Sequence, residues 1–372
     1  MANEFLEPIT EQTFYLNMGP QHPSTHGVLR LFLKLDGEYI VEADPVIGYG
    51  HRGHEKMAES HLYEQFLPNS SRMDYLAGLI YNHGYVAAVE KMAGIEVPKR
   101  AEFIRVICAE LNRISSHLLW FGTFVMDLGG FTPFLYCFDD RENILDILDR
   151  VSGSRLTYSY CRIGGVARDL DDEFIKATRE FIDRLRSRWD DYHNLVTKNV
   201  IFIHRVKGVG TINRELALRF GCTGPILRAA GVAYDIRKAE PYSVYPEFDF
   251  EIPTGTTGDA LDRYMVRLQE MEQSLRIIEQ ALDRLPEGPI RAAVPHKVRP
   301  PKGDYYFAVE SARGALGYYI VSDGTSYPYR LKARVPSYGN LQVLTDVLPG
   351  TLVADTISIL GSIDIVVPEV DR

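Results

Sequence analysis

Two histidines alternate with two prolines in one short segment near the N-terminus. Residues 19–27 read GPQHPSTHG, which places His22 and His26 four positions apart. Proline stiffens the backbone and imidazole titrates near neutral pH, so the pattern suits proton donation or metal ligation. A polar turn whose imidazoles bond to nearby carbonyl groups is an equal alternative from these residues alone.

Tyr75 and Asp127 are two further candidates for proton chemistry. A phenol and a carboxylate can both act as acid–base groups. Each residue also has an ordinary structural interpretation. A tyrosine on an apolar helix usually belongs to the core, and an aspartate before Leu128-Gly129-Gly130 is usually a cap or turn residue.

Several common cofactor motifs are absent from the sequence. Ala58 stands where a zinc-binding HExxH motif would need its second histidine after His54, and residues 255–258 lack the lysine of a phosphate-binding loop. No GxGxxG fingerprint follows a strand pattern. The four cysteines form no CxxC pair, so we expect buried, reduced thiols and neither nickel nor an iron–sulfur cluster in the isolated chain; they are Cys108, Cys137, Cys161 and Cys222.

Composition describes an ordinary globular protein. The 372 residues are 45% hydrophobic and 24% charged, and 41 Lys and Arg against 50 Asp and Glu give a net charge of −9 without a basic block. Nucleic acid is therefore not an expected partner. No apolar run reaches membrane-spanning length and the N-terminus lacks a signal-peptide pattern, so we expect a cytoplasmic chain that does not span a membrane.

The periodicity of apolar residues predicts an α+β fold with segregated elements. A small antiparallel sheet is expected over residues 1–50, with a hairpin turn at Asp36-Gly37. A helix bundle follows over 51–294, with clear helices over 104–121, 171–189 and 258–285. After the proline-rich segment 295–301, a C-terminal α+β part over 302–372 contains a second small sheet with strands near 305–309, 317–321 and 329–335. We expect one domain over 1–372.

Seven long motifs in order resemble the 49 kDa subunit family of respiratory complex I, the NADH-quinone oxidoreductase, over essentially the whole chain. The motifs are GPQHPSTHGVLR at 19–30, GYGHRGHEK at 48–56, SRMDYL at 71–76, MDLGGFTPF at 126–134, RENILDILDRVSGSR at 141–155, CTGPILRAAG at 222–231 and EVDR at 369–372. This resemblance implies a quinone-pocket subunit of a proton-translocating complex. F420H2- and ferredoxin-driven complexes have similar subunits, so the electron donor stays open, and a scaffold without a quinone role is the alternative from another class.

The resemblance implies a role for each candidate residue. His26 and Tyr75 would hydrogen-bond the two quinone oxygens, and Asp127 would bond to the imidazole of His26. A carboxylate behind an imidazole favours its protonated form, which suits a reaction that needs two protons. Electrons would come from a 4Fe–4S cluster in a neighbouring subunit, with Arg52 and Arg72 near that cluster; an ordinary ion pair is their structural alternative.

The resemblance also implies partners and a location. The partners would be the subunit with the terminal iron–sulfur cluster, a separate 30 kDa-type subunit and the membrane subunit with the quinone channel. The chain would lie on the cytoplasmic side of the cell membrane as a peripheral subunit.

The same motifs are similar to the [NiFe]-hydrogenase large subunit, whose nickel ligands are four cysteines. This chain has Asp74, Ala77, Val366 and Glu369 at those positions. Nickel needs soft sulfur ligands there, so we reject hydrogenase activity and expect an emptied metal cavity that became a quinone chamber.

Three positions depart from the 49 kDa family pattern. Many relatives have R-x-H where this chain has Arg155-Leu156-Thr157, and the resemblance implies that their histidine binds a proton when the cluster is reduced. Thr157 cannot titrate in that range, which favours a low-potential acceptor such as menaquinone over ubiquinone. The segment 310–315 reads ESARGA instead of EAPKGE, and Pro368 replaces a glycine. We expect both changes to lie away from the quinone contacts and to affect local loops.

Overall fold

A computed structural model describes residues 13–22 and 27–372. In this part of the chain, three strands form an N-terminal antiparallel sheet in the order β1 (Thr13–Met18), β2 (Arg30–Asp36) and β3 (Tyr39–Val46). Alternate residues of β2 are buried, because successive side chains of a strand point to opposite faces. The hairpin between β2 and β3 lies where Asp36-Gly37 predicted it, and Gly37 has a positive φ of 59°.

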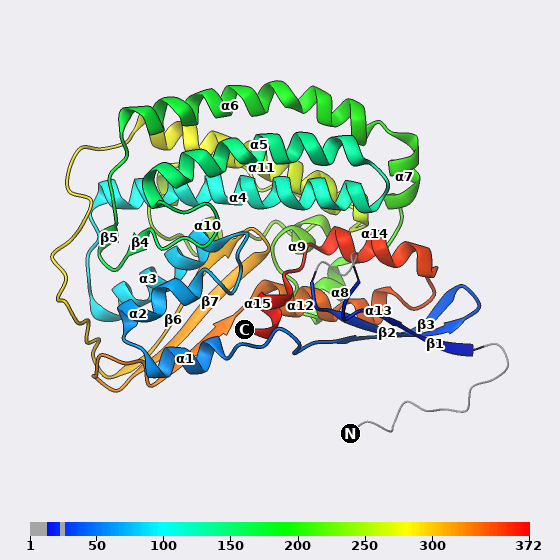
Figure 1. Cartoon of the computed structure of the whole chain (residues 1–372), viewed down its shortest axis with the longest axis horizontal. Coiled ribbons are helices and arrows are strands. Elements are labelled where there is room, and N and C mark those ends of the chain that lie inside the picture. The colour runs from blue at the N-terminus through cyan, green and yellow to red at the C-terminus, as the bar shows by residue number, and fades with distance from the viewer. Residues whose placement is uncertain (1–12, 23–26) are drawn as a thin grey trace.

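Long helices form the middle of the molecule (Figure 1). Four of them lie side by side as a layered bundle: α4 (Lys99–Asp127), α5 (Phe131–Ser152), α6 (Asp172–Tyr192) and α11 (Ala260–Asp283). Asp171 caps α6 by accepting a bond from the amide of Phe174, and Asp259 caps α11 in the same way through Asp262. The two capping aspartates lie at or next to the helix starts expected from the sequence, residues 171 and 258.

Shorter elements connect the bundle to the two sheets. Before α4 lie α1 (His54–Ser60), α2 (Tyr63–Ser70) and α3 (Gly78–Ala93). Between α5 and α11 lie β4 (Cys161–Arg162), β5 (Gly165–Val166), α7 (Val200–Val206), α8 (Arg214–Arg219), α9 (Pro225–Ala229) and α10 (Ile236–Ala239).

The C-terminal part consists of a three-stranded antiparallel sheet followed by short helices. The sheet has the order β6 (Gly303–Ser311), β7 (Gly314–Ser322) and β8 (Arg330–Arg334), and the helices are α12 (Pro336–Gln342), α13 (Leu344–Val347), α14 (Val353–Ile363) and α15 (Val367–Asp371). A methyl group on Gly84 would lie 2.9 Å from Val309, so α3 packs closely on this sheet. The predicted α+β class and its three parts are confirmed.

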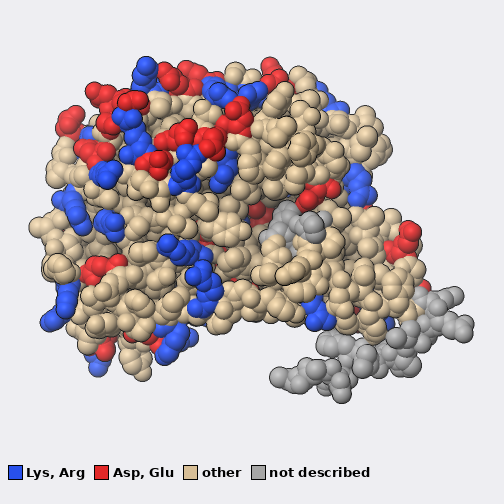
Figure 2. Space-filling view, viewed as in Figure 1, with Lys and Arg blue, Asp and Glu red and all other residues tan. Residues whose placement is uncertain are grey.

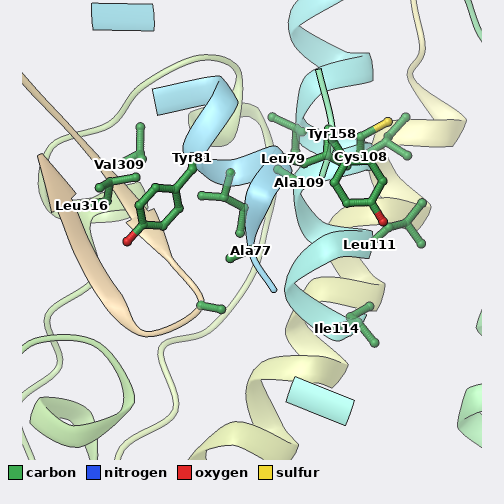
Figure 3. Packing of buried hydrophobic residues seen from close by; sticks show 14 of the residues in the cluster. Ala77, Leu79, Tyr81, Cys108, Ala109, Leu111, Ile114, Tyr158, Val309 and Leu316 are labelled. Carbon is green, nitrogen blue, oxygen red and sulfur yellow. The ribbon is translucent and has the colours of Figure 1, made fainter. Parts of the chain in front are cut away.

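Two hydrophobic clusters stabilise these parts. The larger includes α3, α4, α11 and the C-terminal sheet, and Figure 3 shows Tyr81 of α3 next to Val309 and Leu316 of that sheet. The smaller joins the N-terminal sheet to the C-terminal helices. Backbone bonds between Ile40 and residues 350–351 add to this contact. The first and last segments of the chain are therefore held together (Figure 1). That the chain is one domain stays a prediction.

Candidate functional site

A pocket of about 300 Å³ lies where the end of α4 meets two loops. Tyr75 lines it from the segment before α3, Asp127 from the last turn of α4, and Asp364 from the segment between α14 and α15. The remaining lining is mostly apolar and consists of Leu76, Leu119, Trp120, Thr123, Met126, Ile365 and Val366. Two of the three predicted catalytic residues, 52 positions apart in the sequence, thus share one pocket.

Tyr75 presents a neutral phenol to this pocket. Its side chain is half-buried, and within the described residues its hydroxyl group has no hydrogen-bond partner. Burial raises the pKa of Tyr75, and the nearby carboxylates of Asp74 and Asp364 raise it further against the opposing effect of Arg313. The phenol therefore keeps its proton at neutral pH and is available to donate a hydrogen bond.

The third predicted residue, His26, lies outside the described residues, so its contact with Asp127 stays a prediction. Its neighbour Gly27 is described, and a methyl group built on Gly27 would lie 3.2 Å from Val367. Val367 follows the pocket residue Val366. Gly27 therefore lies next to Val367, the residue that follows Val366 in the chain.

Arg52 and Arg72 do not line this pocket but lie around a different side chain, His54. Arg52 is exposed, and Arg72 donates to the carbonyl oxygen of Pro68 at 2.6 Å. His54 is 1% exposed, and neither ring nitrogen has a hydrogen-bond partner among the described residues. Burial lowers the pKa of His54 to about 4, helped by the charges of Arg52, His51 and Arg72. The imidazole is therefore neutral at neutral pH.

A fully buried ionic cluster lies directly behind the pocket. Arg313, in the turn between β6 and β7, donates to Asp74 at 2.7 Å and to Asp364 at 3.3 Å. Our expectation that the altered segment 310–315 lies away from the proposed quinone contacts is therefore wrong. The turn brings Arg313 to the residue next to Tyr75 and to a carboxylate that lines the pocket, because β6 and β7 pack on α3.

Pro368, the other altered position, is the second residue of the short helix α15 and lies in its first turn, where proline is well tolerated. This helix brings Glu369 into the interior, where it is 0% exposed. The sequence alone presented Asp74 and Glu369 only as remnants of a metal motif, and it did not single out Asp364 as a pocket residue. The signal that could have found them is that residues 72–77 and 364–369 align with the two ligand motifs of one metal site in the hydrogenase large subunit, and two motifs of one site must meet in space.

Two of the residues that align with nickel ligands of the hydrogenase large subunit are bonded to other side chains of this protein. Asp74 binds Arg313, and Glu369 accepts bonds from the backbone and hydroxyl groups of Ser337. Among the described residues, no group of three or more His, Cys, Asp or Glu side chains is arranged to hold a metal ion. The side chains at this site offer hard carboxylate oxygen atoms, and these already accept hydrogen bonds from arginine and serine. Such a donor set does not fit nickel.

A wider hollow lies elsewhere on the described surface. It has a volume of about 680 Å³ and is lined by Arg162, Arg291 and His296 among others. It contains none of the predicted site residues. Among the described helices, none combines the length and apolar character required to cross a membrane.

Comparison with known proteins agrees with the motifs. The family described as "Respiratory-chain NADH dehydrogenase, 49 Kd subunit" matches residues 127–302 and 292–372. An NADH-quinone oxidoreductase subunit of Syntrophobacter fumaroxidans is 71% identical over 100% of both chains. The corresponding NADH-quinone oxidoreductase subunits of Desulfotalea psychrophila and Desulforamulus reducens are 56% and 53% identical, over 97% and 98% of this chain and 98% and 99% of theirs. The chain belongs to the 49 kDa subunit family of the respiratory-chain NADH dehydrogenase, as its motifs predicted.

Proposed function

We propose that this chain is the quinone-pocket subunit of a proton-translocating NADH-quinone oxidoreductase. The observation that carries the proposal is the presence of Tyr75 and Asp127 in one mostly apolar pocket. A quinone head group is a flat apolar ring with two carbonyl oxygens, and such ligands bind in apolar pockets with a few convergent polar groups. A scaffold protein has no need of a half-buried phenol whose hydroxyl group finds no hydrogen-bond partner among residues 13–22 and 27–372.

The proposed chemistry assigns one role to each residue. Tyr75 donates a hydrogen bond to one quinone oxygen, and His26 donates to the other. Asp127 stabilises the protonated imidazole of His26 through its negative charge. Reduction by two electrons makes both quinone oxygens more basic, so both donors bind the reduced form more tightly than the quinone. These interactions favour quinol formation.

The partners follow from family membership. The electrons would reach the quinone from a 4Fe–4S cluster in a neighbouring subunit, on the side where Arg52 and Arg72 surround His54. We assign the other contacts to a separate 30 kDa-type subunit and a membrane subunit with the quinone channel. The chain would then be a peripheral subunit on the cytoplasmic side of the cell membrane.

The test is a Tyr75→Phe variant in the intact complex. Loss of a positioned proton donor should lower quinone reductase activity by about 100-fold while electron transfer from NADH to an artificial acceptor at the donor end is unchanged. Tyr305→Phe is a matched control, because Tyr305 is also half-buried but lies in the C-terminal sheet. Full quinone turnover in Tyr75→Phe would show that Tyr75 is a packing residue. The scaffold hypothesis would then be the one that remains.

Asp127→Asn tests the second half of the proposed site. The amide cannot stabilise a protonated His26, so quinone turnover should fall although the variant assembles normally. Asp127→Glu keeps the charge and should retain more activity than Asp127→Asn. Equal activity of the two variants would contradict an electrostatic role for Asp127.

A further inference from the structure

Glu369 is a buried carboxyl group without a cation of its own. It is 0% exposed, and Ser337 donates to its two oxygens, from the backbone amide to Oε1 at 3.1 Å and from the hydroxyl group to Oε2 at 2.8 Å. In the part of the chain that the structure describes, no Lys or Arg forms an ion pair with it. Burial without a paired cation favours the neutral, protonated form of a carboxyl group.

The charges around Glu369 do not balance when every group is ionised. Asp74 and Asp364 share the guanidinium group of Arg313, and Arg267 lies 3.9 Å from Asp364. The cluster therefore contains three carboxyl groups and two guanidinium groups. Oδ2 of Asp364 and Nε of Arg313 are also buried without a hydrogen-bond partner among the described residues. One bound proton makes this buried cluster electrically neutral.

Glu369 is the member of the cluster on which that proton resides. Burial raises its pKa to about 7, and repulsion by Asp74 also raises it, against the effects of Arg313 and of the two bonds from Ser337. Burial raises the pKa of Asp74 as well, but a guanidinium group at 2.7 Å and the backbone amides of Leu76 and Ala77 stabilise its anion, whereas Glu369 has no paired guanidinium group among the described residues.

Two phenols also face Glu369 from neighbouring elements. Tyr81 comes from α3 and Tyr318 from β7, and Figure 3 shows the ring of Tyr81 between its helix and the sheet. Burial and the negative charge of Glu369 raise the pKa of both phenols well above the usual value of tyrosine. They stay neutral at neutral pH and therefore leave Glu369 as the titrating group of this region.

We propose that Glu369, Asp74 and Arg313 form a proton-storage site that returns a proton to Tyr75 after Tyr75 has protonated the quinone. Asp74 is adjacent to Tyr75 in the chain, and Asp364 lines the same pocket as Tyr75. This inference rests on the proposed quinone function. It adds a residue that does not touch the quinone but determines how fast Tyr75 regains its proton.

The proposed step balances in protons and electrons. The quinone takes two electrons from the neighbouring iron–sulfur cluster and two protons to become quinol. One proton leaves the O–H bond of Tyr75, which becomes a phenolate, and the other leaves the protonated imidazole of His26, which becomes neutral. The Glu369 carboxyl group then supplies the proton that restores the phenol and becomes a carboxylate, which regains a proton from water.

The experiment measures quinone turnover by the intact complex between pH 6 and 8. The native kcat should fall as the pH rises through about 7, because the protonated form of Glu369 is depleted. In Glu369→Gln the side chain has a similar size but carries no proton to give. Its kcat should be about 10-fold lower and nearly independent of pH, with KM unchanged.

Ser337→Ala is the matched variant. It should shift the pH profile of kcat if Glu369 stores a proton, whereas a packing role of Glu369 predicts no such shift. The hydroxyl group of Ser337 stabilises the Glu369 anion, so its removal should raise the pKa and move the fall in kcat to higher pH. Infrared difference spectra of the complex should show a protonated-carboxyl band that is missing in Glu369→Gln. An unchanged pH profile in Glu369→Gln, or the absence of that band, overturns the proton store.

The Tyr75 variant separates the two proposals. If Tyr75→Phe loses turnover while Glu369→Gln keeps the native pH profile, only the proton store is wrong. If Tyr75→Phe keeps full turnover, the proposed quinone function fails as well.

Discussion

Thr157 cannot bind a proton when the iron–sulfur cluster is reduced, so the question is whether a histidine can do so instead. His54 is the histidine on which the answer depends. His51 donates from Nδ1 to the carbonyl oxygen of Asp371 at 2.6 Å, whereas His54 lies within the electrostatic influence of both Arg52 and Arg72. The pKa of His54 would have to rise from about 4 into the range of 6 to 8 before it could take up a proton at neutral pH. The two arginine charges oppose that rise.

We therefore predict that the terminal iron–sulfur cluster of the complex has a reduction potential that depends little on pH. Thr157 cannot bind a proton and His54 stays neutral, so reduction is not coupled to protonation at this place. The expected potential is low, which suits menaquinone better than ubiquinone. A redox titration at several pH values between 6 and 8 tests this prediction.

Full coupling of one proton to one electron would give a slope of about 59 mV per pH unit. Such a slope would contradict the prediction from Thr157. A Thr157→His variant supplies the positive control, because it restores the residue of many relatives and should create the pH dependence. If the native slope is steep and disappears in His54→Gln, His54 has taken over the role.

At the scale of elements, the sequence predicted helices best where one face is polar. The stripe of apolar residues in α6 and the acidic residue before it located this helix closely, because its other face meets solvent. In α3 almost every residue is buried, so it carries no clear period and was not predicted separately. The sheets were predicted from alternation and turn residues, which depend on local geometry.

The candidate site was predictable only in part for a similar reason. Motifs singled out Tyr75 and Asp127, which line one pocket, but nothing in the local sequence shows that Arg313 contacts Asp74, a residue 239 positions away. That contact depends on how the β6–β7 turn packs against the loop before α3. Long-range packing of this kind leaves no period in the sequence, and the expectation for segment 310–315 failed there.

The C-terminal element α15 holds the segment that leads into Arg52. The side chain of Asp371 accepts bonds from the amides of Gly48 and Gly50 at 2.8 and 2.6 Å. Asp371→Ala removes both bonds to a charged acceptor, which should lower the free energy of unfolding by about 2 to 3 kcal/mol. Chemical denaturation of the purified chain measures this loss, and hydrogen exchange at Gly48 and Gly50 should become faster.

Asp346→Ala is the control for that prediction. Asp346 forms an exposed ion pair with Arg219, and such pairs contribute less than about 1 kcal/mol. If the two variants lose the same stability, the bonds to residues 48–51 do not hold this segment in place.

At the scale of the whole molecule, buried charges connect the pocket with the bundle. Beyond Arg313, buried ion pairs join Arg228 to Glu270 and Glu310, and Arg237 to Glu110, from residues far apart in the sequence. Buried pairs contribute little net stability, because desolvation of the charges offsets their attraction. Their effect here is to fix how α4, α11 and the C-terminal sheet are placed around the pocket.

The surface near the pocket carries apolar side chains that a partner subunit would cover. Charged residues are dense over α6 and α5, whereas the neighbouring surface toward α7 shows fewer of them (Figure 2). Phe131 and Ile201 are 60% and 70% exposed and line one hollow of about 320 Å³ together with Leu195. Met126, 36% exposed, lies at this end of α4 and also lines the pocket that contains Tyr75 and Asp127. Exposed apolar groups gathered around one hollow are typical of protein interfaces.

We predict that Ile201→Asp prevents stable assembly of the complex without unfolding the chain. A carboxylate at this position would have to lose its water when the partner covers it, and no paired cation would compensate. The isolated variant should unfold within about 0.5 kcal/mol of the native chain, because Ile201 is exposed there. Native gel electrophoresis of solubilised membranes measures assembly, and Leu218→Asp, which changes a leucine 54% exposed on α8, serves as the control. Normal assembly of Ile201→Asp would show that this surface faces solvent in the complex.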